Sequence, residues 1–313
     1  MKKLFPLLTA LALTLTACAA PAASTASQSA EAEGLTVVTT LFPYYDFARS
    51  VAGDRAEVTL LLAGGAESHS YEPTVQDVMT MASADLLLYN GGSSEHWLDE
   101  LTDSLPAGQH RVALMNSVET LCLEHDGDGE ADDCDRAHEA DEHVWTSPKN
   151  AVVLVRKICE ELTALDAEGA EVYAARAEQL IEQLNALDAQ FTALVKDAKR
   201  DTLVFGDRFP LLYFTEAYGL DWKAAFDGCA EDTEPSAARV VELIDYVKEH
   251  QIPAVYHLEL SNASICQTIA EATGCAVLEF HSCHNVTAEQ LAEGVSYCEL
   301  MEANLAALEV GLQ

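Results

Sequence analysis

Single histidines stand at three turns that lie far apart in this chain. His69 sits in a Gly-rich turn after an apolar run, His143 lies just before a helix start, and His281 follows another apolar run. A neutral imidazole is a good ligand for Zn²⁺ and other first-row cations. A zinc finger takes its ligands from closely spaced positions. The wide spacing here instead predicts a metal site assembled between separate lobes.

Other polar side chains at the ends of apolar runs could complete such a site. Asp207 follows an expected strand and could supply an oxygen ligand, or it could pair with Arg208 as a structural salt bridge. Glu259 ends another strand and could line the cleft or face solvent. His284 lies three residues after His281, and we interpret it first as a surface residue at a helix entry, with metal ligation as the alternative.

Alternating strand and helix patterns predict an α/β fold in which mostly parallel sheets are flanked by helices. Expected strands cover residues 35–40, 56–62, 86–89, 112–114, 202–205, 222–226, 254–258 and 276–280. Expected helices cover residues 42–52, 75–82, 97–104, 210–218 and 236–250, with further helices that begin at 148 and 287.

One long helix is predicted between the two halves of this pattern, from about 169 to 199. Its apolar residues recur at alternating spacings of four and three, which places them on a single stripe: Tyr173, Ala177, Leu180, Leu184, Leu187, Phe191 and Leu194. At 1.5 Å per residue the helix would run ~45 Å. A coiled-coil arm is the alternative, but the stripe is short and lacks regular flanking charges. We therefore expect a connector that spans two lobes.

The expected organisation follows from this connector. Residues 34–165 would form an N-terminal lobe, 166–200 the linker helix and 201–313 a C-terminal lobe. The N-terminal lobe would carry an acidic loop at 119–142, which has no apolar period.

The first residues have the pattern of a leader rather than of a folded domain. Two lysines precede an apolar run at 4–15, which predicts a secretory signal peptide over 1–17. The run ends at Cys18 in a pattern that resembles a bacterial lipobox, so we expect a lipid on this thiol. Residues 18–33 would then form a flexible tether. The prediction is an extracytoplasmic protein anchored to the cell membrane; an ordinary signal peptide is the alternative.

Charge and cysteines limit the function further. The formal net charge of −35 argues against nucleic acid, whose phosphates would be repelled, and is compatible with gathering cations. The 9 cysteines form no Cys-x-x-Cys pair, so a thiolate zinc ribbon is not expected. Export permits disulfides. Cys122 and Cys134 could close the acidic loop, and Cys229 with Cys283 is a second plausible pair, but spacing alone fixes no connectivity.

Several stretches together resemble one family, the substrate-binding lipoproteins of zinc and manganese ABC importers, of the metal-binding antigen type. The resemblance covers nearly all of 35–313 and is closest to the zinc-type branch. One matching stretch is His143-Val144-Trp145-Thr146-Ser147-Pro148-Lys149-Asn150-Ala151. The other matching stretches are 40–48, 67–74, 89–92, 218–220, 234–236 and the C-terminal helix.

The resemblance implies a function and two ligands. It implies capture of Zn²⁺ between the lobes by His69 and His143, and delivery to a membrane permease driven by a cytoplasmic ATPase. A monomer is expected, and no reaction is catalysed. Mn²⁺ is the alternative cargo, and a surface adhesin is a further alternative, which would need an exposed apolar patch. An exported zinc hydrolase is disfavoured because the chain has no His-Glu-x-x-His motif.

Two departures from the family pattern concern the C-terminal half of the site. The family's Phe-His-Asp-x-Phe stretch reads here with Gly206 in place of the histidine. His281 stands at the position where the family usually has an aspartate, near the last strand. We therefore predict His281 as a third imidazole, with Asp207, Glu259 or water completing the site. Three imidazoles favour Zn²⁺ over Mn²⁺, which prefers oxygen. The acidic loop would be at most a low-affinity collector.

Overall fold

A computed structural model describes residues 34–67, 69–122, 140–226 and 235–313. All of them belong to one compact unit, Gly34–Gln313. The predicted signal peptide, the predicted lipidation site Cys18, the predicted tether, Cys134 and Cys229 lie outside the described residues. Within the described ranges, the structure contains no helix with the length and apolar character needed to cross a membrane.

The N-terminal lobe is built on a four-stranded parallel sheet with strand order β2-β1-β3-β4. Its strands are β1 (Leu35–Thr39), β2 (Ala56–Leu60), β3 (Leu86–Tyr89) and β4 (His110–Ala113). Its helices are α1 (Phe42–Ala52), α2 (Val75–Ser83), α3 (His96–Leu101) and α4 (Pro148–Leu165). The central strands are apolar and buried, as expected of a parallel sheet that is covered on both faces.

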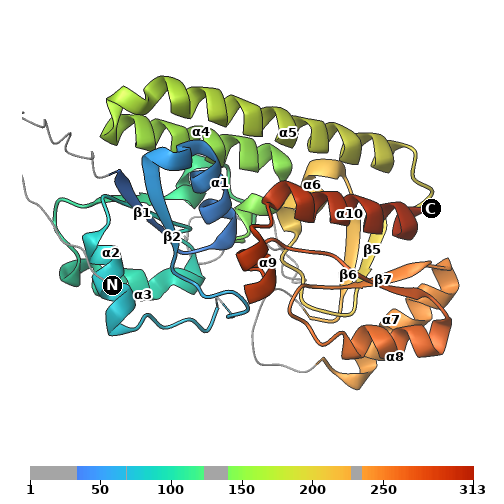
Figure 1. Ribbon diagram of the computed structural model, residues 1–313. Coiled ribbons are helices and arrows are strands. Elements are labelled where there is room, and N and C mark those ends of the chain that lie inside the picture. The colour runs from blue at the N-terminus through green and yellow to red at the C-terminus, as the bar shows by residue number, and fades with distance from the viewer. Residues whose placement is uncertain (1–33, 68, 123–139, 227–234) are drawn as a thin grey trace, which may run out of the picture. The chain divides into compact units, whose positions relative to one another are not determined.

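The C-terminal lobe repeats this plan with strand order β6-β5-β7-β8, again all parallel. Its strands are β5 (Thr202–Phe205), β6 (Asp221–Ala224), β7 (Ala254–His257) and β8 (Ala276–Glu279). Its helices are α6 (Leu212–Tyr218), α7 (Ala237–His250), α8 (Ser264–Thr273), α9 (Ala288–Glu293) and α10 (Tyr297–Leu312). Helices α7 and α8 lie together on one side of the sheet, and α10 packs against the sheet from the other (Figure 1). The predicted two-lobed α/β fold is confirmed.

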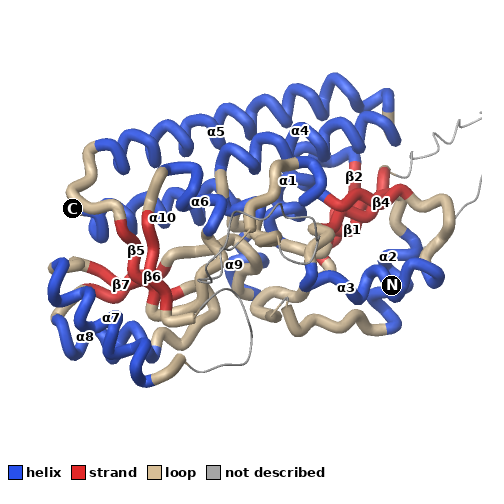
Figure 2. Tube along the Cα trace, turned by 180° about the vertical axis from the view of Figure 1, so that it is seen from behind, coloured by secondary structure: helices blue, strands red, loops and turns tan. Residues whose placement is uncertain are grey.

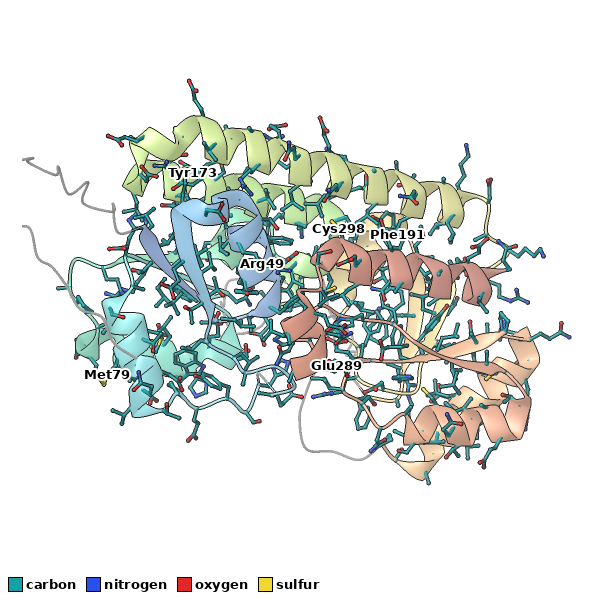
Figure 3. All side chains as sticks on the ribbon, viewed as in Figure 1. Arg49, Met79, Tyr173, Phe191, Glu289 and Cys298 are labelled. Atoms are coloured by element: carbon teal, nitrogen blue, oxygen red, sulfur yellow. The ribbon has the colours of Figure 1, made fainter. Side chains whose placement is uncertain are left out.

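The long helix α5 (Ala170–Lys196) connects the lobes, as predicted. It lies alongside α4 and α1 at one end and reaches α10 and α6 at the other, which Figure 2 shows from behind. Its apolar stripe is buried from Tyr173 to Phe191 (Figure 3). Tyr173 packs beside Arg55 of the first lobe, and the Phe191 ring lies 5.1 Å from that of Phe214 in the second. One hydrophobic core therefore runs through both lobes.

Two helices differ from the sequence prediction. Helix α8 was not predicted: it is short and begins after Ala263, whose φ of 54° is left-handed and whose side chain offers no cap. The single C-terminal helix expected from 287 is interrupted at Gly294, where φ is 76°, so it forms α9 and α10. Helix α9 begins after Thr287, as expected, and Thr287 forms a capping box with Gln290.

The cysteine predictions have different outcomes. Cys122 is disulfide-bonded. The proposed pairing of Cys283 with Cys229 is wrong, because Cys283 is a free, buried thiol. Cys283 instead lies inside the turn that carries two of the candidate histidines.

Candidate metal centre

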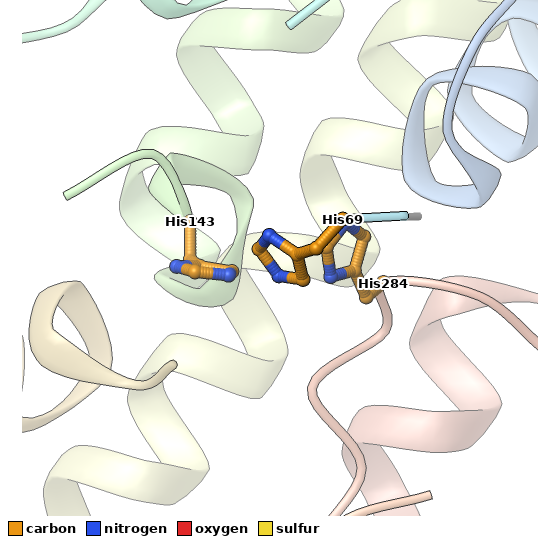
Figure 4. Close-up of side chains that lie close together, drawn as sticks. All are labelled: His69, His143 and His284. Atoms are coloured by element: carbon orange, nitrogen blue, oxygen red, sulfur yellow. The ribbon is translucent and has the colours of Figure 1, made fainter. Parts of the chain in front are cut away.

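Three imidazoles from distant parts of the chain meet at one point. His69 comes from the loop between β2 and α2, His143 from the turn before α4, and His284 from the segment after β8 (Figure 4). One ring nitrogen from each lies within 4.8 Å of the other two. The ring centroids are 5.6 Å apart for His69 and His143, 5.0 Å for His69 and His284, and 5.4 Å for His143 and His284. We call these three residues the histidine cluster.

Two consecutive carboxylates orient the imidazoles of the N-terminal lobe. Asp141 Oδ1 accepts the backbone N–H of His143 at 2.9 Å and lies 3.1 Å from His143 Nδ1. A proton on Nδ1 then donates to Asp141 and leaves the Nε2 lone pair for a cation, as is usual for metal-binding histidines. Glu142 Oε1 lies 3.6 Å from Nδ1 of His69, while its Oε2 accepts from Ser94 N and Oγ at 3.1 and 2.7 Å.

Electrostatics favour the neutral form of two imidazoles of the cluster, those of His69 and His284. Burial lowers the pKa of His69, and the neighbouring His143 lowers it further. Burial also lowers the pKa of His284 well below its usual value, with additional contributions from His143, His69 and Arg208. A depressed pKa favours the neutral imidazole, which is the species that coordinates a cation.

Contacts between the lobes hold the loops of the cluster. Asn285 Nδ2 donates to the carbonyls of Ala63 and Ala66, at 2.9 and 2.8 Å, in the loop that leads to His69. Trp145 Nε1 donates to Ser282 O at 2.9 Å, and the Trp145 ring lies 4.9 Å from that of His284. The position of His284 is thus set by both lobes.

The structure does not group His281 with the cluster. His281 Nδ1 accepts the N–H of Cys283 at 2.9 Å. The backbone of His281 is held by Asn304, which accepts from its N–H and donates to its carbonyl, both at 2.7 Å. The interpretation of His284 as a surface residue is wrong, because it is buried and takes the place we expected for His281. The sequence places His, Cys and His within four residues, which indicates a candidate metal site. This spacing does not determine which of the two imidazoles faces the cleft.

The carboxylates of Asp207 and Glu259, the two other predicted ligands, accept hydrogen bonds from backbone N–H groups. Asp207 accepts from the N–H groups of Arg208 and Leu258, at 2.8 and 3.2 Å. Glu259 accepts from the N–H groups of Ser282 and His284, at 2.7 and 3.3 Å. Within the described ranges, neither belongs to the group of side chains close enough to share an ion.

A small cavity of about 40 Å³ opens beside the cluster. Its lining includes His69, His284, Glu67, Arg208 and Glu259. Arg208 Nη2 and Glu67 Oε2 form an ion pair of 3.3 Å between the two lobes at this cavity. The space is enough for a water molecule, whose share of liquid volume is ~30 Å³.

The space around Gly206 is too small for the histidine that the family usually has at this position of the Phe-Gly-Asp stretch. A Cβ at Gly206 would stand 2.5 Å from Cys266 Sγ and 2.9 Å from Cys266 N. Cys266 is fully buried, and its thiol donates to Tyr256 O at 3.1 Å. A histidine at 206 would therefore have no room.

These two α/β lobes, with imidazoles gathered between them, define a class of metal-binding protein. The chain belongs to the family described as zinc-uptake complex component A, periplasmic (ZnuA), whose model matches residues 37–311.

Named relatives agree with this assignment. The zinc-binding lipoprotein AdcA of Streptococcus pneumoniae serotype 4 is 34% identical over 316 residues, which cover 99% of this chain and 61% of the relative. The high-affinity zinc uptake system protein ZnuA of Bacillus subtilis is 29% identical over 301 residues and 92% of each chain. The chain thus spans less than two thirds of the length of the pneumococcal relative.

The fold also matches solved structures. The crystal structure of the Zn(II)-bound ZnuA-like domain of S. pneumoniae AdcA has 32% sequence identity and a TM-score of 0.74, and the match covers 90% of this chain and 100% of that one.

Proposed function

We propose that this protein captures Zn²⁺ outside the cytoplasm and delivers it to the membrane permease of an ABC importer. The observation that carries the proposal is the histidine cluster, in which ring nitrogens of His69, His143 and His284 lie within 4.8 Å of one another. Zinc is bound at ~2.0–2.1 Å by imidazole nitrogen, so three such nitrogens can converge on one ion. The ion is the cargo, and the protein acts as a binding protein rather than an enzyme, in keeping with its family.

The donor set supports zinc as the cargo. Three neutral imidazoles suit Zn²⁺ better than Mn²⁺, which prefers oxygen ligands. A fourth ligand can enter from the cavity beside His69 and His284. The Zn(II)-bound AdcA domain, which this chain resembles over 90% of its length, supports the same cargo.

The proposed location follows from the leader. A signal peptide over 1–17, a lipid on Cys18 and a tether over 18–33 would hold the two lobes at the outer face of the cell membrane. The pneumococcal relative is named a lipoprotein, which supports this arrangement. The lobe boundaries at 34–165, 166–200 and 201–313 and a monomeric state are part of the same proposal.

Calorimetric titration of the metal-stripped protein with Zn²⁺ and with Mn²⁺ tests the function. We expect one tight Zn²⁺ site and weaker Mn²⁺ binding, and loss of the Zn²⁺ site in His69→Ala. His96→Ala is the matched control, because His96 is exposed and its Nδ1 lies near Ser93 O, outside the cluster. Absence of tight Zn²⁺ binding by the unmodified protein would refute the proposal.

A further inference from the structure

The turn that carries His284 is strained. Cys283, the residue before His284, has a φ of 61°, in the left-handed region that favours glycine. A buried side chain persists in such a conformation only when the surroundings hold it there.

Glu259 supplies the largest share of the contacts that hold this turn. It lies two residues beyond the end of β7, and its side chain is only 9% exposed. Its Oε2 accepts the backbone N–H of Ser282 at 2.7 Å, and its Oε1 accepts the Ser282 hydroxyl and, at 3.3 Å, the backbone N–H of His284. One carboxylate thus binds both sides of the strained residue.

Most other contacts hold the turn before Cys283, while Ser282 Oγ accepts the N–H of His284 at 3.3 Å. Asn304 binds the N–H and C=O of His281, and Trp145 binds Ser282 O. On the far side, Asn285 is directed towards the other lobe, where it binds Ala63 and Ala66. Glu259 Oε1 and Ser282 Oγ, which is itself bound to Glu259, therefore share the N–H of His284 and tie it to the segment after β7.

We propose that Glu259 is the positioning residue of the metal site. It fixes the strained turn so that the His284 imidazole faces His69 and His143. Its carboxylate also lines the cavity shared by His69 and His284, so its negative charge acts on a cation held there. The inference rests on the proposed function, because it assumes that the histidine cluster holds the cargo.

Substitution of Glu259 by Gln tests this role. Gln keeps the size and one acceptor oxygen but loses the charge and the second acceptor. We expect Zn²⁺ affinity to fall by about 10- to 100-fold, the range usual for residues that orient metal ligands. We also expect the visible absorption of the Co²⁺-loaded protein to change, because the third imidazole is no longer held in place. Glu259→Asp, which keeps the charge, should recover part of the affinity.

Asp207→Asn is the matched control. Asp207 is also a buried carboxylate that accepts two backbone N–H groups at a strand end, but it binds Arg208 and Leu258 rather than the turn. We expect its Zn²⁺ affinity and Co²⁺ spectrum to match those of the unmodified protein. An equal loss in Asp207→Asn would overturn the specific role of Glu259.

The outcomes separate this inference from the proposed function. If the unmodified protein binds Zn²⁺ tightly and Glu259→Gln binds it equally, with the same Co²⁺ spectrum, the positioning role is refuted and the function stands. A fall in melting temperature with unchanged metal binding also refutes it, because a merely structural residue behaves in that way. Should Glu259→Gln fail to fold, Ser282→Ala carries the test, since it removes one donor to the same carboxylate and, with it, the second acceptor of the His284 N–H. It should then reduce Zn²⁺ affinity and shift the Co²⁺ spectrum in the same sense, and an unchanged Ser282→Ala would overturn the proposal.

Discussion

His281 and His284 stand three residues apart on one turn, but only the His284 ring reaches His69, at a centroid distance of 5.0 Å. His281 Nδ1 accepts the N–H of Cys283 instead. The left-handed conformation of Cys283 between them turns the two rings into different surroundings. The left-handed backbone conformation of Cys283 therefore determines which histidine supplies the third imidazole of the site.

Substitutions at the two positions should have unequal effects on metal binding. His284→Ala removes a proposed ligand and should lower Zn²⁺ affinity by more than about 100-fold, since even residues that only orient ligands cost 10- to 100-fold. His281→Asn keeps an acceptor that can reach the N–H of Cys283, so its affinity should stay close to that of the unmodified protein. Calorimetric titration of both variants checks the pair. A larger loss in His281→Asn than in His284→Ala would restore His281 as the ligand.

Asp141 should control the basicity of His143 without touching the ion. Its Oδ1 lies 3.1 Å from His143 Nδ1. In Asp141→Asn the side chain can donate an N–H to His143 Nδ1. The imidazole then carries its proton on Nε2, the nitrogen that should bind the ion. We expect Zn²⁺ affinity to fall about 10- to 100-fold. Competition against a chromophoric chelator measures this loss, and Asp141→Asn with unchanged affinity would show that the contact is only structural.

Patterns along the chain predicted the elements that bring the lobes together. The apolar stripe predicted α5 because a single-faced helix must bury that face, and Tyr173 and Phe191 are buried against different lobes. His69 and His143 were predictable as a pair from the motifs around them. The strands were found within a residue or two because buried parallel strands are short apolar runs.

The C-terminal half of the site was less predictable for a physical reason. Whether His281 or His284 faces the cleft depends on contacts from Glu259, Asn304 and Trp145, which are distant in sequence. The positive φ of Cys283 has no sequence signal, because glycine is the residue usually found in that conformation. The space that a histidine at position 206 would need is likewise filled by the thiol of Cys266 from α8, which is distant in sequence.

Restoring that histidine should not restore a ligand. In Gly206→His the new side chain would meet Cys266, whose Sγ stands 2.5 Å from the position of a Cβ. Overpacking of this kind costs about 1–3 kcal/mol of folding stability. We expect lower stability in urea unfolding and no gain in Zn²⁺ affinity. Tighter Zn²⁺ binding at undiminished stability would show that the C-terminal lobe can adopt the family's usual ligand set.

Glu95 should make the stability of the N-terminal lobe depend on pH. Its side chain is buried, and its Oε2 accepts the N–H of Gly91 at 2.8 Å. Glu95 follows Ser94, whose hydroxyl binds the Glu142 carboxylate near the histidine cluster. Burial raises the pKa of Glu95 from 4.5 to about 7. Between pH 4.5 and about 7, Glu95 therefore stays protonated in the folded protein but is ionised in the unfolded chain. This contribution to stability is complete below pH 4.5 and is lost as the pH rises through about 7.

Glu95→Gln cannot ionise, so it should remove this dependence. Relative to the unmodified protein it should gain stability as the pH rises from 5 to 8, approaching about 3 kcal/mol, because each unit of pKa shift corresponds to ~1.4 kcal/mol. Denaturant unfolding across this pH range measures the difference. Glu100→Gln, at an exposed position of α3, is the control and should show a constant offset. A constant offset for Glu95→Gln as well would mean that Glu95 is ionised throughout and that its burial is compensated by its neighbours.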